Sequence, residues 1–176
     1  GKLPDTIAYE ISDYPSDKFF GSGDMDCYGE DIYVGYRYFE TFAKDRVRFP
    51  FGFGMSYTSF DIAASDFKLD GDKVTGSVNV KNTGSTPGRE VVQIYCSAPQ
   101  GKLGKPARVL CGFDKTRTLQ PGESQTITMN VDMSLLASYD SQNAKTFIVD
   151  PGDYYFAIGT DAHDALNNVL AAQGKT

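Results

Sequence analysis

The sequence predicts an all-β protein, namely an antiparallel β-sandwich that follows an extended, mostly irregular N-terminal arm. From residue 65 onward, apolar residues alternate with polar ones in short runs, which is the period of a half-buried strand. Turn-forming residues separate these runs. Before that point, aromatics, glycines and prolines are frequent but follow no sustained period. We therefore expect residues 1–62 to form an arm that packs on another body, and residues 63–176 to form the sandwich.

The alternation places the strands in chain order. The clearest strand covers residues 74–81 and stops at an Asn-Thr-Gly turn at 82–84. The further strands that the alternation predicts cover residues 90–98, 108–118, 124–131, 147–149 and 154–158. Residues 132–137 offer a short helical turn between two of them. About seven strands in roughly 100 residues is the size of an immunoglobulin-like or fibronectin-like sandwich.

Two further segments are harder to assign. Apolar residues are dense in 30–42, EDIYVGYRYFETF, but Gly35 would interrupt a helix, so we expect a short strand or turn. Residues 162–172 fit either a strand that leaves the sandwich or a short helix, and the sequence does not decide between them.

Length and charge limit the function. A chain of 176 residues can hold one core and a smaller appendage, but not a large enzyme barrel. The 23 acidic residues outnumber the 17 basic ones, and no lysine- or arginine-rich run is present, so we expect no nucleic-acid partner. Every apolar run ends well before the ~20 residues that cross a bilayer, so we expect no membrane partner either.

The three cysteines, Cys27, Cys96 and Cys111, do not form a metal-binding or disulfide pattern. Cys96 and Cys111 continue the inward-facing positions of their strands, so we expect small, free, buried thiols. Free thiols favour a cytoplasmic location. A Cys96–Cys111 disulfide is the alternative if the two strands pair, and it would indicate secretion.

The candidates for chemistry are weak. A serine or cysteine triad would depend on His163, the one histidine, and we expect a solvated turn histidine there. The densest acidic group lacks the full calcium-loop pattern, so we expect no metal and no cofactor and interpret the group as a solvated or salt-bridged loop. Its members are Asp24, Asp26, Glu30 and Asp31.

Two aromatic segments suggest packing. FPFGFGMS, residues 49–56, lacks the lysine of a phosphate-binding loop, so its glycines are expected to let aromatic rings approach the backbone. The tyrosines at 28, 33, 36 and 38 are expected to face a missing domain, because such side chains are enriched at interfaces.

Several motifs in order resemble glycoside hydrolase family 3. GKLPDTIA (1–8) resembles the end of the family's α/β-sandwich domain. EDIYVGYRYFET (30–41) and FPFGFGMSYTSFD (49–61) resemble its "E.IYVGYRYFE" and "PFGFGLSYT.F" signatures, with Met55 in place of leucine. The stretches at 78–95, 110–127 and 149–159 resemble the fibronectin type III-like module of the same enzymes. The tail from residue 159 resembles members in which the catalytic barrel follows the sandwich, which implies a parent chain that continues past Thr176.

The resemblance implies a parent enzyme of β-glucosidase type, with a retaining mechanism that uses two carboxyl groups. Neither catalytic residue of the family maps onto this chain, so no catalytic residue is expected in it. Glu30 matches the glutamate of the "E.IYVGYR" motif, and we interpret it as a structural ion-pair candidate with Arg37 or another arginine rather than as a catalytic acid.

The resemblance also implies partners. The expected partners are the barrel and α/β-sandwich domains of the parent, which the module would stabilise, and a β-glucoside substrate reached through the parent. The alternatives are a carbohydrate-binding module that tethers polymeric substrate, and a parent that is a β-xylosidase.

Overall fold

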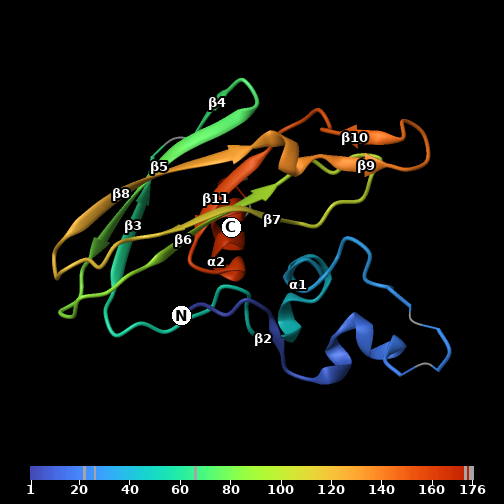
Figure 1. Cartoon of the computed structure of the whole chain (residues 1–176), viewed down its shortest axis with the longest axis horizontal. Coiled ribbons are helices and arrows are strands. Elements are labelled where there is room, and N and C mark those ends of the chain that lie inside the picture. The colour runs from blue at the N-terminus through green and yellow to red at the C-terminus, as the bar shows by residue number, and fades with distance from the viewer. Residues whose placement is uncertain (22, 26, 66, 173, 175–176) are drawn as a thin grey trace.

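A computed structural model describes residues 1–21, 23–25, 27–65, 67–172 and 174 of the chain. Asp26, one of the acidic candidates, lies outside the described residues. The elements run from a short arm into a set of antiparallel strands and end in a helix (Figure 1). The arm contains β1 (Ile7–Ala8), η1 (Ile11–Asp13), η2 (Pro15–Phe19), α1 (Tyr36–Phe42), η3 (Lys44–Arg46) and β2 (Val47–Phe49).

Two antiparallel sheets form the sandwich, which confirms the predicted fold class. In one sheet, β5 pairs with β3, β4 and β8; in the other, β6 lies between β11 and β7. Their bounds are β3 (Phe60–Ala64), β4 (Lys68–Asp70), β5 (Lys73–Asn82), β6 (Val91–Ser97), β7 (Val109–Lys115), β8 (Ser124–Asp132) and β11 (Tyr155–Gly159). The predicted division between residues 62 and 63 falls inside β3.

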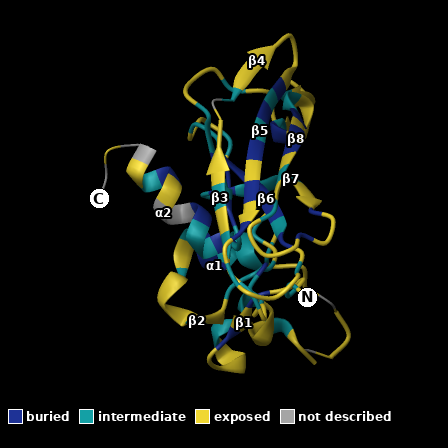
Figure 2. Ribbon diagram, turned by 90° about the vertical axis from the view of Figure 1, so that its left-hand side faces the viewer, coloured by how far each residue is buried: buried dark blue, intermediate teal, exposed yellow. Residues whose placement is uncertain are grey.

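The core lies between these sheets. Val74 pairs with Val131, and Val78 with Ile127, so that alternate positions of β5 and β8 point inward together. They pack with Val92 and Ile94 of the facing sheet in one buried cluster. Figure 2 shows the buried stripes along β5 and β8 and the mostly exposed arm. The alternation that predicted the strands is therefore the pattern of core contact.

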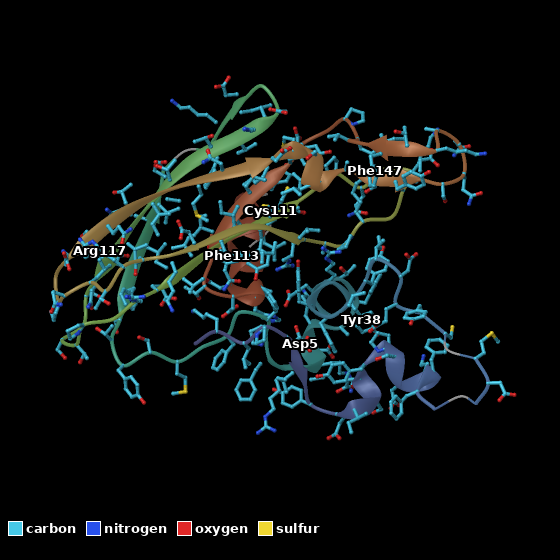
Figure 3. The ribbon with its side chains drawn as sticks, viewed as in Figure 1. Asp5, Tyr38, Cys111, Phe113, Arg117 and Phe147 are labelled. Atoms are coloured by element: carbon cyan, nitrogen blue, oxygen red, sulfur yellow. The ribbon has the colours of Figure 1, made fainter. Side chains whose placement is uncertain are left out.

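The thiols are free, as expected. Cys96 is buried, and Cys111 packs against the core between the sheets, where its Sγ lies 3.3 Å from the carbonyl oxygen of Ile94 (Figure 3). Burial raises the pKa of Cys111 to about 12, so this thiol stays protonated and unreactive at neutral pH. Cys27 is exposed.

The structure assigns the two segments, 30–42 and 162–172, that were hard to assign from the sequence. The expectation of a strand or turn at 30–42 is wrong for its second half, which is the helix α1. Gly35 has φ 57° and ψ −127° and stands at the helix N-cap, so it begins the helix rather than interrupting it. Residues Ala162–Ala172 form the helix α2. Neither helix, nor any other in the described part of the chain, is long and apolar enough to cross a membrane.

Both faces of β6 are covered. One face contributes to the core between the sheets, and the other, which includes Tyr95, packs with Ala162, Ala165 and Val169 of α2. Tyr36 of the arm and Phe51 complete this second cluster. The arm and α2 therefore meet on the outer face of the β11–β6–β7 sheet.

Candidate interdomain junction

A buried carboxylate lies where the arm, the sandwich and α2 meet. Glu40 comes from α1, Arg108 from the residue before β7, and His163 from the first turn of α2. One Glu40 oxygen, Oε2, lies 3.2 Å from Arg108 Nη1, and the other, Oε1, lies 2.8 Å from His163 Nδ1. The Glu40 and Arg108 side chains are only 1% and 2% exposed. Three segments distant in sequence therefore converge on one carboxylate.

The charges at this point depend on one another. Burial lowers the pKa of Arg108, and the Glu40 carboxylate acts in the opposite direction. The hydrogen bond to Glu40 raises the pKa of His163. Arg108 Nη1 also donates to the carbonyl oxygen of Ala162 at 2.9 Å, which ties the strand to α2. A buried ion pair adds little net stability over apolar residues, but breaking it leaves an uncompensated buried charge, so we interpret the cluster as fixing the position of the arm.

Neutral contacts extend the junction along α1. The Tyr36 hydroxyl accepts a hydrogen bond of 2.8 Å from the backbone N–H of Leu110, and the Tyr36 ring lies 4.8 Å from that of Phe51. Thr41 Oγ1 accepts a hydrogen bond of 2.9 Å from the N–H of Ala107. These N–H groups stand at the start of β7, so α1 supplies their hydrogen-bond partners.

A second polar group lies beside Gly52, on the outer face of β6. The Tyr95 hydroxyl donates to Gln93 Oε1 at 2.6 Å, and Gln93 Nε2 donates to the carbonyl oxygen of Thr160 at 2.8 Å. Gly52 has φ +85°, and a Cβ there would stand 2.5 Å from Gln93 Nε2. At Gly52 the close neighbour is therefore an amide, not the aromatic ring that the sequence suggested.

The predicted ion-pair candidates are not brought together. Glu30 and Arg37 are half-buried, and among the described residues neither has an ion-pair partner. The buried pair of this segment is carried by Glu40 instead. The available signal was a charge inside the apolar run YRYFETF, but nothing local in the sequence identifies Arg108 or His163 as its partners.

The expectation for His163 is wrong. Its side chain is 40% exposed and lies at the start of a helix, hydrogen-bonded to a carboxylate that is 123 residues away in sequence. The tyrosines divide as well: Tyr36 is packed inside the junction, whereas Tyr28 is 92% exposed. Only some of the predicted interface tyrosines are therefore free to face another body.

The junction does not resemble a catalytic or metal site. The Glu40 carboxylate is buried against Arg108 and has no access to a substrate. Within the described ranges, no three His, Cys, Asp or Glu side chains are grouped so as to hold a metal ion. The contacts that the arrangement does make join the arm, the start of β7 and α2.

Many of the large apolar side chains of the arm are uncovered in this chain. Phe20 and Tyr28 are each 92% exposed. The others with high exposure are Tyr9, Ile11, Met25, Val34, Phe42, Met55 and Tyr57.

The sequence and the fold of this chain are similar to those of known proteins. Residues 90–162 match the family described as fibronectin type III-like domain. A β-glucosidase of Ruminococcus albus is 57% identical over 94% of this chain, which spans 18% of that protein. A β-glucosidase structure from Paenibacillus barengoltzii has 50% identity and a TM-score of 0.89 over 93% of this chain, which spans 19% of it. The structure of a Bifidobacterium adolescentis GH3 β-glucosidase has 34% identity and a TM-score of 0.83 over 93% of this chain, which spans 24% of that protein.

The chain is thus a fibronectin type III-like β-sandwich with an arm that packs on the outer face of one of its sheets. The resemblance to glycoside hydrolase family 3 is confirmed: nearly all of the chain corresponds to a segment of β-glucosidases of that family. It spans only about a fifth of the length of these relatives.

Proposed function

We propose that this chain is a non-catalytic structural module of a larger retaining β-glucosidase, and that it stabilises the catalytic domains of that enzyme. Its partners are then the barrel and α/β-sandwich domains of the parent, and the β-glucoside substrate is bound by the parent rather than by this module.

One observation carries the proposal: the arm is fixed to the sandwich through α1 and also presents uncovered apolar side chains. Glu40, Arg108 and His163 hold the arm. Phe20 and Tyr28 remain almost fully exposed. Exposed aromatic side chains of this kind are typical anchors of a domain interface, because covering them removes a large apolar area from water.

The experiment uses the full-length enzyme with Phe20→Ser and Tyr28→Ser combined. We expect a lower melting temperature and reduced hydrolysis of a β-glucoside, because two aromatic anchors of the interface are lost. Leu69→Ser on β4, where the side chain is 65% exposed, is the matched control and should change neither. If the arm variant also behaves like the wild type, the arm does not contact the catalytic domains.

A further inference from the structure

The hairpin of β9 (Ser138–Asp140) and β10 (Thr146–Ile148) stands apart from both sheets of the sandwich. Its strands pair with each other, with Phe147 opposite Tyr139 and Ile148 opposite Ser138. Figure 1 shows it extending beyond the two sheets. A two-stranded hairpin is marginally stable by itself, so its two faces must find contacts elsewhere.

The two faces of the hairpin have different surroundings among the described residues. Asp140 and Ile148 line a cavity together with Leu103 of the loop before β7. The other face carries Tyr139, Phe147 and Val149, which are 53%, 70% and 45% exposed. Figure 3 shows Phe147 on this protruding hairpin. One face thus borders this cavity beside the module, and the other is apolar and uncovered.

The uncovered face is held in place before any partner binds. The Asp140 carboxylate accepts hydrogen bonds from the backbone N–H groups of Gln142, Asn143 and Ala144, which fix the turn. At the base of the hairpin, Asp150 forms an ion pair with the buried Lys105. A preformed apolar face loses little entropy on binding.

We infer that the face formed by Tyr139, Phe147 and Val149 is a second protein-docking surface, and that a domain of the parent chain outside these 176 residues covers it. The inference rests on the proposed function. The chain spans 18% and 19% of two relatives, so most of the parent is available to supply the partner.

The ring geometry favours a protein over a sugar. Tyr139 and Phe147 pack edge to face, with centroids 5.2 Å apart and planes at 66°. The two rings therefore do not form a common flat platform. Aromatic clusters of this kind are typical of the apolar centre of a protein interface.

Hydroxyl-radical footprinting of the full-length enzyme tests the inference without a substitution. Labelling of each side chain is compared with labelling of the same peptide in the denatured enzyme. We expect Tyr139 and Phe147 to be labelled several-fold more slowly in the native enzyme than their exposure in this module implies. Leu69, 65% exposed on β4, is the control and should show no such protection.

The other outcomes are distinct. Fast labelling of Tyr139 and Phe147 in the native enzyme would overturn the docking surface, whether or not the arm is protected. Fast labelling that slows only when a soluble β-glucan is added would overturn it in favour of a sugar site. Phe20 and Tyr28 report the proposed function separately in the same experiment: if they are labelled fast while the hairpin is protected, the arm contact fails and the hairpin contact stands.

Discussion

The sandwich and the arm are stabilised in different ways. Between the sheets, valine, isoleucine, leucine and methionine side chains from both sides form one buried cluster. Among the described residues of the arm, the buried side chains are Thr6, Ala8, Phe39 and Glu40, and many of the large apolar ones are exposed. The sandwich therefore has a core of its own, whereas the arm depends on a polar junction and on a body that covers its outer surface. Variants in the two regions should show this difference.

Loss of the junction carboxylate should have the largest effect. Glu40→Gln leaves Arg108 buried without its counter-charge, and we expect the free energy of unfolding of this chain to fall by about 3–5 kcal/mol in urea titration. Glu123→Gln is the control, because Glu123 pairs with Arg117 at 2.6 Å on the surface. That substitution should have little effect. Equal losses for the two variants would mean that the junction is not a buried charge cluster.

The core comes next. Ile94 is fully buried, and Ile94→Ala should lower the free energy of unfolding by about 2–5 kcal/mol. Ile11, in the arm, is 78% exposed. Ile11→Ala should change the stability of this chain by no more than about 0.5 kcal/mol. In the full-length enzyme we expect a clearly larger loss for Ile11→Ala, and its absence would argue against a covered arm.

The pH dependence should be the smallest effect. The hydrogen bond to Glu40 raises the pKa of His163, and burial and Arg108 oppose it. Protonated His163 therefore contributes stability that is fully present below about pH 6.5, the ordinary histidine value, and is lost as the pH rises through the higher folded-state pKa. The His163 ring signals in an NMR titration report this pKa directly, since the sequence has one histidine.

Glu40→Gln provides the check on that titration. If Glu40 is the cause, the pKa of His163 should fall in this variant, provided that it remains folded. The wild-type stability should also decline as the pH rises above about 6.5, and His163→Gln should remove this decline. An unchanged His163 pKa in Glu40→Gln would show that the two side chains do not interact in solution.

The sandwich could be predicted from sequence because its determinants are local. Val78 and Val80 alternate with polar residues in one strand, and this period alone determines which side chains enter the core. The short strands β3, β4 and β9 were not predicted, because runs of three to five residues carry little periodicity. The equally short β10 and β11 could be predicted because a Pro-Gly turn at 150–153 separates them.

The junction could not be predicted in the same way. Glu40 and His163 are 123 residues apart, and only the folded sheet brings them together. The low helix propensity of Gly35 predicts an interrupted helix, but Gly35 stands at the N-cap, where that propensity does not apply. Family resemblance identified the segment, and the geometry identified the glutamate within it that carries the contact.

The central claim is that this chain supports catalysis without performing it. The most direct test is hydrolysis of p-nitrophenyl β-glucoside by the purified 176-residue chain, alone and mixed with the remaining domains of the parent enzyme. We predict no turnover by the chain alone and activity in the mixture. Turnover by the chain itself would contradict it, because carboxylates of this module would then form a catalytic site.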